Sequence, residues 1–455
     1  MEGEWSELPL EEAMDAIIDY RGKTPKKTDS GIPLITAKIV KNGRIQPTQE
    51  YIAEADYDSW MQRGIPQKGD VVLTTEAPLG EVAQLDGSKI ALAQRIITLR
   101  GKSGLLDSDF LKFLLQSHAV QHQFDGRASG TTVSGIKQSE LRQVLLSFPP
   151  LHEQKAIAHV LGSLDDKIEL NRRMNETLEG MAQALFKSWF VDFDPVIDNA
   201  LAAGNPIPEP LAQRAETRRQ AIANRTANRD SAQAFPASFR FTEELGYIPE
   251  GWEVKEIRER TKTIQYGLTQ SASEEECGPR FLRITDIRGG EIKWNQVPYC
   301  ETSPDQFEKY KINDGDIFVA RTGASTGENV YVSSPEQSVF ASYLVRLTFE
   351  NRGIGRIVGM FMRTPRYFEY IDAILGGSAQ PNASAQTLAS ASMVFPSNDC
   401  SELFFEKASL MDSRKVTNEK ESQTLANLRD VLLPKLISGE LRIPQAEKMV
   451  EEAVA

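Results

Sequence analysis

Hydrophobic residues between positions 152 and 190 recur at alternating intervals of four and three residues. Such spacing places them on one stripe of a helix, and the stripe is typical of a helix that packs against another helix. Two positions of the stripe carry asparagine where leucine is expected. The pattern therefore predicts a long helix whose partner accepts polar side chains in the middle of the contact. The positions on the stripe are Ile157, Leu161, Leu164, Ile168, Asn171, Asn175, Leu178, Ala182, Leu185 and Trp189.

The chain also contains an internal repeat with a period of 247 residues. This offset holds from the first globular part into the long helix, which indicates a tandem duplication. Each predicted unit is a globular part followed by a long helix. Identical residues at this spacing include Trp5 and Trp252, Gly80 and Gly327, Leu141 and Leu388, Phe148 and Phe395, Asp165 and Asp412, Asn171 and Asn418, and Leu178 and Leu425.

The same offset predicts a stripe on a second long helix, which is again apolar at its ends and polar in its middle. Duplicated units tend to associate as a dimer would, so we expect the two helices to pair antiparallel about a pseudo-two-fold axis. The predicted positions are Phe404, Ala408, Met411, Lys415, Asn418, Ser422, Leu425, Arg429, Leu432 and Leu436.

Residues at the midpoints of such a pair meet their own equivalents, so Asn171 is predicted to face Asn418. A buried amide pair lowers stability but fixes register. In the alternative, both asparagines point to solvent and each helix packs on its own domain. The second helix carries Lys415 and Arg429 where the first has Ile168 and Ala182, which favours a looser second helix or cover by partner subunits.

The globular parts have the pattern of mixed α/β structure. Buried strands are predicted at 69–75 and 315–321, each after a turn, with further strands at 91–100 and 342–349. Helical periodicity covers 108–124, capped by Ser108 or Asp109, and 353–374.

The predicted fold class is α+β: two similar mixed α/β domains separated by two long antiparallel coiled-coil helices, in a pseudo-two-fold symmetric tandem repeat. The first helix, at roughly 1.5 Å per residue, is about 57 Å long. It would act as a ruler for two half-sites on one face of a DNA duplex. The predicted boundaries are 1–150 for the first globular domain, 151–197 for the first helix, 198–247 for a linker, 248–397 for the second globular domain, 398–440 for the second helix and 441–455 for the tail.

Known catalytic patterns do not match this sequence. RGKT at Arg21 and RGKS at Arg100 lack the first glycine of a phosphate loop, because Ile17 and Ile96 stand there. His118 and His122 have zinc-ligand spacing, but no further histidine or cysteine follows at a ligand interval, so no metal is predicted. The residues indicate a chain that is not an enzyme and holds no cofactor.

Composition adds two expectations. The chain shows no signal-peptide pattern and no apolar run of membrane length, and its three cysteines have no CxxC spacing, which suits a cytoplasmic protein. Its net charge of -12 disfavours tight binding of nucleic acid by the chain alone. A local basic face on a nearly neutral domain remains able to bind phosphate.

Several motifs, in order, resemble one family over nearly the whole chain. The segment FPPLHEQKAIAHVLGSLDDKIELNRRMNETLEGMAQALFKSWFVDFDPV closely resembles the central conserved region of the specificity subunits of Type I restriction-modification systems. ELGYIPEGWEV resembles the opening of their second target-recognition domain, and NLRDVLLPKLISGELRI their closing conserved region. DYRGKTPKK and GIPLITAKIV are similar to the start of many first recognition domains.

The resemblance implies a non-catalytic chain that binds double-stranded DNA. Each target-recognition domain would read one half of a split, asymmetric site, and the helices would set the gap and dock two methyltransferase subunits. Those subunits would carry S-adenosylmethionine and methylate adenine, and restriction subunits would translocate and cleave DNA. Alternatives are a specificity subunit of a methylation-only complex and a coiled-coil adaptor that reads no DNA. The adaptor leaves the two globular domains with divergent loops unexplained.

Candidate DNA-binding residues are Lys, Arg, hydroxyl and amide side chains in loops, because these contact phosphates and base edges. In the first domain they are Lys23, Thr24, Lys26, Lys27, Thr36, Lys38, Lys41, Arg44, Arg127, Ser129, Thr131, Thr132 and Lys137. In the second they are Tyr266, Thr269, Gln270, Arg283, Thr285, Arg288, Arg321, Thr322, Ser325, Gln380 and Asn382. For any single surface cation, a solvated charge is the competing interpretation.

Overall fold

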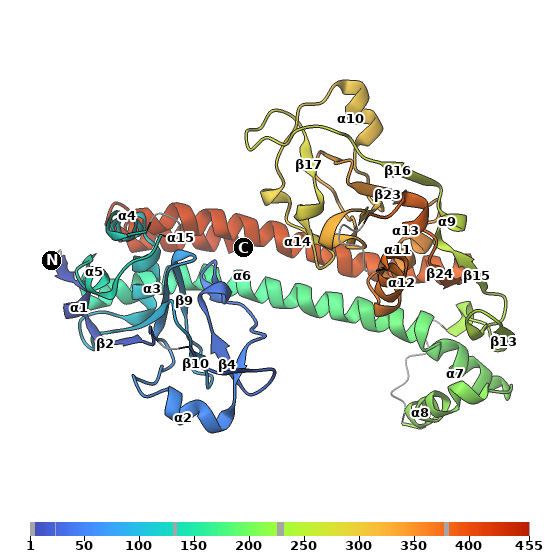
Figure 1. Ribbon diagram of the computed structural model, residues 1–455, viewed down its shortest axis with the longest axis horizontal. Coiled ribbons are helices and arrows are strands. Elements are labelled where there is room, and N and C mark those ends of the chain that lie inside the picture. The colour runs from blue at the N-terminus through green and yellow to red at the C-terminus, as the bar shows by residue number, and fades with distance from the viewer. Residues whose placement is uncertain (1–4, 23, 131–133, 225–231, 377–381, 455) are drawn as a thin grey trace. The chain divides into compact units, whose positions relative to one another are not determined.

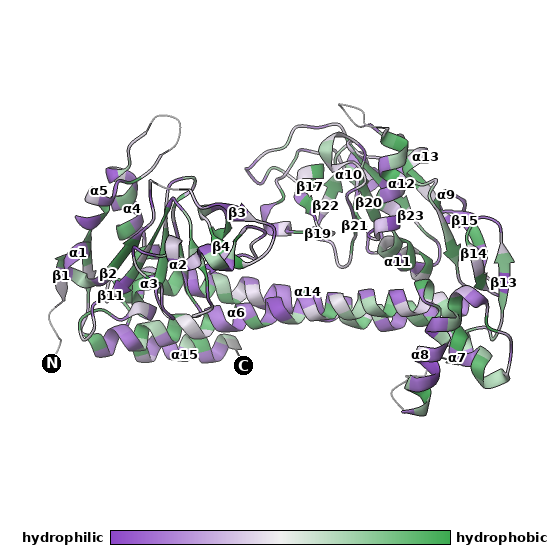
Figure 2. Cartoon of the chain, turned by 60° about the horizontal axis from the view of Figure 1, so that its bottom comes forward, coloured by the Kyte–Doolittle hydropathy of each residue, from purple (hydrophilic) through white to green (hydrophobic). Residues whose placement is uncertain are grey.

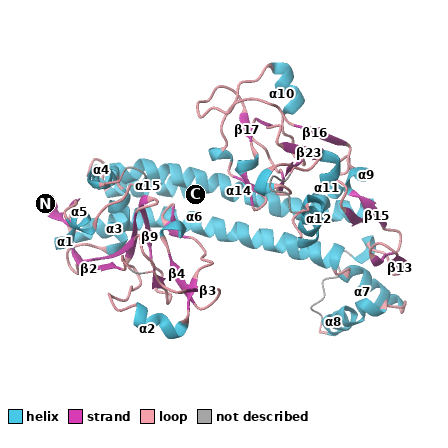
Figure 3. Cartoon of the chain, in the orientation of Figure 1, coloured by secondary structure: helices cyan, strands magenta, loops and turns pink. Residues whose placement is uncertain are grey.

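The computed structural model describes residues 5–22, 24–130, 134–224, 232–376 and 382–454. The chain forms two compact units. Unit 1 comprises residues 1–171 and 420–455, and unit 2 comprises residues 172–419. Each unit combines helices and strands (Figure 3), in agreement with the predicted α+β class.

The globular part of unit 1 is built on a four-stranded antiparallel sheet of order β2-β11-β8-β9. Alternate residues of its strands enter two different cores. Val71 and Leu73 pack with the helices on one face, whereas Val72 packs on the other. The sheet is therefore covered on both sides, which explains the continuous apolar runs of its strands. The strands are β2 (Met14–Asp19), β8 (Val71–Thr75), β9 (Leu79–Gln84) and β11 (Ile96–Gly101).

A second sheet of shorter strands, in the order β10-β4-β7-β3, covers one face of this sheet. A hairpin of β5 and β6 lies beside β9 of the first sheet. Its core contains Leu34, Ile52 and Leu92. The strands are β3 (Lys27–Thr28), β4 (Ile32–Ile35), β5 (Val40–Lys41), β6 (Arg44–Ile45), β7 (Tyr51–Ile52) and β10 (Ala91–Leu92).

Unit 2 has a sheet of the same antiparallel pattern, in the order β16-β23-β20-β21. Ile317 and Val319 pack on one face with helix α11, and Phe318 packs on the other face. Figure 2 shows that the strands of both sheets are largely hydrophobic. The elements are β16 (Thr263–Tyr266), β20 (Ile317–Ala320), β21 (Asn329–Tyr331), β23 (Leu344–Thr348) and the parallel pair β17 (Arg280–Leu282) and β22 (Ser338–Phe340).

The helices predicted at 108–124 and 353–374 are each divided into two helices in the structure. The first breaks at Ser117, whose extended backbone is held by a hydroxyl that donates to the Leu114 carbonyl at 2.6 Å. The second breaks before Pro365, which pushes the preceding Thr364 into an extended conformation. The prediction of Ser108 or Asp109 as the cap of the first helix is also wrong. Asp107 is the cap, because its side chain accepts from two backbone N–H groups. The helices are α3 (Ser108–Gln116), α4 (His118–Arg127), α11 (Arg352–Phe361) and α12 (Pro365–Leu375).

Helices α6 (Leu151–Phe186) and α14 (Asn398–Ile437) run through both units and pack antiparallel within each (Figure 1). In unit 1, Asp165 pairs with Arg429 at 2.9 Å; in unit 2, Glu179 pairs with Lys415 at 2.9 Å. Both cations therefore have an acidic partner on α6, and the looser second helix stays a prediction. The hydrophobic ends of both stripes are buried as predicted.

Asn171 and Asn418 are buried, so the alternative in which both face solvent is wrong. Asn171 is 1 % exposed and Asn418 is 0 % exposed. Within unit 1, the Asn171 amide donates to Glu421 at 2.8 Å; within unit 2, the Asn418 amide donates to Asn175 at 2.7 Å. Asn171 and Asn418 belong to different units, and their predicted pairing stays a prediction.

Short elements complete both units. In unit 1, β1 pairs with β12 and α15 packs its Ala446 into the core. In unit 2, β15 pairs with β24, and helices α7 and α8 form a hairpin after α6. None of the described helices has the length and apolar character that crossing a membrane requires. The bounds are β1 (Ser6–Pro9), α1 (Leu10–Ala13), α2 (Tyr57–Trp60), α5 (Gln138–Arg142), β12 (Leu145–Phe148), α7 (Asp194–Ala203), α8 (Ala212–Ala223), β13 (Phe239–Thr242), β14 (Gly246–Pro249), β15 (Glu253–Glu256), α9 (Ile257–Arg260), β18 (Ile287–Arg288), β19 (Glu291–Ile292), α10 (Pro304–Tyr310), α13 (Ala385–Leu388), β24 (Ser392–Phe395) and α15 (Ile443–Val454).

Candidate DNA interface

Three predicted residues of unit 2, distant in the sequence, meet at one end of its sheet. Tyr266 is the last residue of β16, Arg321 directly follows β20, and Asn382 precedes α13. The guanidinium carbon of Arg321 lies 4.8 Å from the centre of the Tyr266 ring, and its Nη2 donates to Asn382 Oδ1 at 3.1 Å. We call these three side chains the Arg321 cluster.

The backbone fixes the Arg321 cluster from several sides. The Arg321 N–H donates to the Tyr343 carbonyl at 3.1 Å, and the Ala383 N–H donates to the Arg321 carbonyl at 2.9 Å. The Tyr266 hydroxyl accepts from the Ala385 N–H at 3.0 Å. A guanidinium stacked on an aromatic ring and held by an amide is orientated before any ligand arrives.

Sequence reasoning missed Tyr343, which lies beside the Arg321 cluster. Its side chain is 58 % exposed, although it directly precedes the buried Leu344 of β23. A large exposed aromatic residue next to an arginine is a frequent feature of binding surfaces. The signal in the sequence was an aromatic residue at the start of a strand, one position outside its buried run.

The other predicted residues of unit 2 lie in the neighbouring loops. Thr322 forms a β-bridge with Asn382, and Ser325 belongs to the short turn that follows. Thr269 follows Leu268, whose carbonyl accepts from the Ser342 N–H at 2.9 Å. Gln270 donates to the Glu301 carbonyl. Arg283 is paired with Asp286 at 2.9 Å, Thr285 lies within that turn, and Arg288 is exposed.

The corresponding end of the sheet in unit 1 has different side chains on the same backbone pattern. The Thr75 N–H donates to the Arg95 carbonyl at 2.9 Å, as Arg321 does to Tyr343. Thr75 is buried, and Arg95 is ion-paired with Glu76 at 2.7 Å. Gln94 donates to the predicted Thr24 at 2.7 Å.

Two further arginines of unit 1 escaped sequence reasoning. Arg21 pairs with Asp19 at 2.9 Å and donates to the Ile136 carbonyl at 3.1 Å, which ties it to the segment before α5. Arg63 donates to the Arg21 carbonyl at 2.6 Å. Arg21 stands in the motif DYRGKTPKK, yet only its neighbours were selected.

Among the described residues, the predicted cations of unit 1 are either exposed or ion-paired. Lys26, Lys38, Lys41 and Lys137 are exposed. Lys27 pairs with Glu50, Arg44 with Glu169 of α6 and Arg127 with Glu140. Thr36 is half-buried at the start of a short turn, and Ser129 bridges Gly135 through the backbone. Lys23, Thr131, Thr132 and Gln380 lie outside the described residues.

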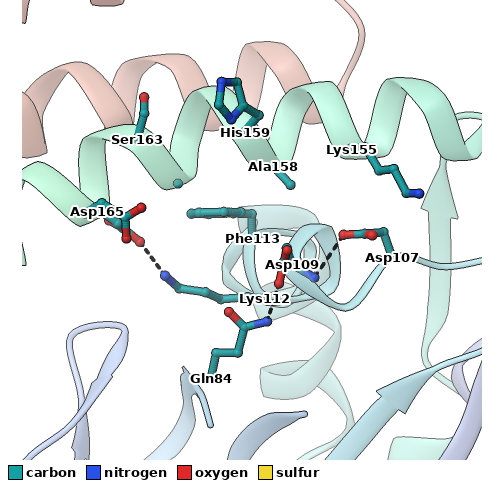
Figure 4. Close-up of a pocket in the computed structure, with 12 residues that line it drawn as sticks. Gln84, Asp107, Asp109, Lys112, Phe113, Lys155, Ala158, His159, Ser163 and Asp165 are labelled. Carbon is teal, nitrogen blue, oxygen red and sulfur yellow. Dashed lines mark hydrogen bonds and ion pairs between the residues drawn. The ribbon is translucent and has the colours of Figure 1, made fainter. Parts of the chain in front are cut away.

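A groove between α3 and α6 in unit 1 shows how the globular part of this unit contacts the long helix (Figure 4). Lys112 of α3 reaches across to Asp165 of α6, which Arg429 also contacts. Burial acts to raise the pKa of Asp165, but Lys112 and Arg429 outweigh it and hold the pKa of this carboxyl below its usual range. The groove is lined by Gln84, Asp107, Asp109, Lys112, Phe113, Lys155, Ala158, His159, Gly162, Ser163, Asp165 and Asp166.

Unit 2 has its own charged attachment. Arg356 of α11 pairs with Asp412 of α14 at 2.9 Å and stacks on Tyr331. Glu179 of α6 contacts both Lys415 and Arg363. Burial disfavours its charged form, but these cations lower the pKa of Glu179 to about 2. Among the described residues, no group of three or more His, Cys, Asp or Glu side chains is arranged to hold a metal ion.

Comparison with known proteins links this geometry to one family. The model of the Type I restriction modification DNA specificity domain matches residues 3–180. The Type I restriction enzyme HindI specificity subunit of Haemophilus influenzae is 26 % identical over 423 residues, which is 82 % of this chain and 87 % of the relative. The MjaIX specificity subunit of Methanocaldococcus jannaschii is 24 % identical, covering 91 % of this chain and 88 % of the relative.

A solved structure supports the fold. The crystal structure of a Type I restriction-modification system S subunit from M. genitalium matches with a TM-score of 0.53 and 15 % sequence identity. The match covers 95 % of this chain and 96 % of that one. Likeness at this level of identity concerns the arrangement of the elements.

Proposed function

We propose that this chain is a non-catalytic DNA specificity subunit of a Type I restriction-modification system, and that each of its two units reads one half of a split, asymmetric DNA sequence. The observation that carries this proposal is the difference between the two sheet ends. Both have one strand order, but unit 2 presents Tyr266, Arg321 and Tyr343, where unit 1 presents Arg95 and a buried Thr75.

Different side chains on a shared backbone pattern imply different bases, so the target is not a palindrome. Base identity is read by hydrogen bonds and apolar contacts at groove edges, and phosphate contacts only position the protein. The exposed lysines of unit 1 suit phosphate contacts, and the Arg321 cluster suits the reading of bases.

The long helices give the proposed complex its spacing and its partners. Helices α6 and α14 connect the two units, so their length and register would set the number of unread base pairs between half-sites. The tandem duplication supports a pseudo-two-fold arrangement, which would present equivalent surfaces to two methyltransferase subunits. Those subunits would bring S-adenosylmethionine, and restriction subunits would complete the complex. The net charge of -12 suggests that much of the DNA affinity comes from these partners.

The test is to co-express the chain with its methyltransferase subunit and to map methylated adenines across a genome by single-molecule sequencing. We expect a split, asymmetric motif with a constant gap. Exchange of the loops around Arg321 should alter only one half of that motif. A palindromic motif would contradict the two-reader proposal. A complex that assembles and binds S-adenosylmethionine but methylates no specific sequence would favour an adaptor.

A further inference from the structure

Arg321 differs from three other arginines of unit 2 in the partners that hold it. Arg283, Arg346 and Arg356 each pair with an aspartate. Among the residues that the structure describes, no carboxylate pairs with Arg321. A tyrosine ring and a neutral amide hold it instead, at 4.8 Å and 3.1 Å. Its positive charge is therefore orientated without being neutralised.

The donors of Arg321 are not equivalent. Its Nε is buried and has no hydrogen-bond partner, and Nη2 gives one hydrogen to Asn382. Nη1 has no hydrogen-bond partner among the described residues, so Nη1 and the second hydrogen of Nη2 are left for a ligand. Two parallel N–H groups match the O6 and N7 acceptors that guanine shows in the major groove, and this is the commonest specific contact of arginine with DNA.

A phosphate contact needs less than this arrangement provides. Phosphate contacts fix the position of the protein on the duplex and carry no direct sequence information. Fixing a guanidinium in advance mainly increases selectivity, because fewer rotamers are lost on binding and the wrong base meets misdirected donors. The stack on Tyr266 and the bond to Asn382 thus favour a base over a phosphate.

On these grounds, and resting on the proposed function, we propose that Arg321 selects one guanine in the half-site read by unit 2. Asn382 and Tyr266 act as positioning residues for its guanidinium. The equivalent backbone position in unit 1 carries the buried Thr75, which cannot present a guanidinium. The guanine contact is therefore specific to one half of the target.

The experiment compares the wild-type methyltransferase complex with complexes that carry Arg321→Ala, Arg321→Lys or Asn382→Ala. The matched control is Arg366→Ala, which removes an exposed arginine of α12 in the same unit. Adenine methylation is mapped by single-molecule sequencing, and its rate is measured on duplexes that vary one base pair at a time. Co-purification with the methyltransferase subunit verifies that each variant folds.

We expect Arg321→Ala to reduce discrimination at one G·C pair by about 5- to 150-fold, with the other half-site and the gap unchanged. Arg321→Lys should relax the same pair, because an ammonium cannot form the two parallel bonds. Asn382→Ala should relax it less, and Arg366→Ala should leave the motif intact.

Two results would overturn the assignment while leaving the proposed function standing. One is an unchanged motif in Arg321→Ala. The other is a uniform loss of rate at all sites that Arg321→Lys restores, which is the signature of a phosphate contact. A wild-type complex that methylates no split sequence would instead overturn the proposed function, and the assignment with it.

Discussion

Asp165 and Asp412 occupy the same position of the repeat, 247 residues apart, yet the two units treat them in opposite ways. In unit 1, two cations contact Asp165, and its pKa lies below the usual range despite burial. In unit 2, Arg356 alone among the described residues pairs with Asp412, and burial raises the pKa of this carboxyl against the effect of Arg356 and Lys415. Duplication has preserved the aspartate but not the balance of charge around it.

The difference predicts opposite responses to pH. The stabilisation that depends on charged Asp165 is present above its unfolded pKa of about 4, and it is lost as the pH falls through the lower folded value. For Asp412 the folded pKa is raised. Its contribution is therefore largest below the unfolded pKa and is lost as the pH rises through the folded value.

The largest expected effect comes from removing the cation of the less protected aspartate. Arg356→Ala leaves Asp412 buried without its direct partner and should destabilise unit 2 by about 3–5 kcal/mol. Lys112→Ala should destabilise unit 1 by clearly less, because Arg429 still contacts Asp165. Hydrogen exchange of α11 and of α3, measured by mass spectrometry, reports each unit separately. Equal losses of stability in both units would contradict the predicted difference between Asp165 and Asp412.

A smaller effect is expected from the acid side chain that neutralises Lys415. The pKa of Glu179 falls from 4.5 to about 2, so Glu179→Gln should destabilise unit 2 by roughly 3 kcal/mol at neutral pH. Since the folded pKa is depressed, the advantage of the wild type should persist above pH 4.5 and shrink between pH 4.5 and 2. Denaturant unfolding at pH 7 and pH 4 measures it.

Glu176→Gln is the control, because Glu176 lies on the same helix but forms only an exposed pair with Arg172. It should change stability by about 0.5 kcal/mol or less. A Glu179 effect that is independent of pH would show that packing, not charge, is responsible.

Substitution of the asparagines of α6 and α14 is expected to cause a smaller loss of stability. Asn418→Leu leaves the Asn175 amide without one partner and should destabilise unit 2 by about 1–3 kcal/mol. Adding Asn175→Leu should recover part of that loss, so a double-mutant cycle should give a favourable coupling of at least about 0.5 kcal/mol. Asn171→Leu should cost less, because its acceptor Glu421 also pairs with Lys167. Additive effects of the two substitutions would contradict this account.

The smallest effect concerns DNA affinity. Lys26→Ala should lower the dependence of the logarithm of affinity on the logarithm of salt concentration by about 0.9, if Lys26 contacts one phosphate, without altering the methylated sequence. Lys27→Ala is the matched control, because Glu50 already pairs with Lys27 at 2.7 Å. Fluorescence anisotropy of the assembled complex at several salt concentrations measures both slopes. A larger change for Lys27 would contradict the assignment.

Sequence patterns predicted the elements that repeat with a regular period. The stripes of α6 and α14 and the buried strands β8 and β20 follow from spacing alone, and the position of Arg321 directly after β20 follows from that strand. The break at Ser117 was not predictable from periodicity, because apolar residues continue across it and only a hydroxyl bond marks it.

Partners across the fold also escaped prediction. Arg44 was selected as a DNA contact, but its ion pair with Glu169 depends on how a hairpin meets a helix 125 residues later. The predicted DNA role of Arg44 stays a prediction. Tyr343 and Arg95 were missed because their importance comes from the backbone of a neighbouring strand, which no local pattern reveals.

The strand pairs β1–β12 and β15–β24 have a consequence for how such a chain changes over generations. Ser6 is paired with Phe148, and Glu253 is paired with Phe395, so the first and last strands of each globular part lie side by side. We call each of these globular parts a cassette, because its two ends are adjacent. Recombination within the repeated helix sequence can replace the whole cassette without disturbing the helices. If each unit reads one half of the target as proposed, one such exchange would change one half of the recognised sequence.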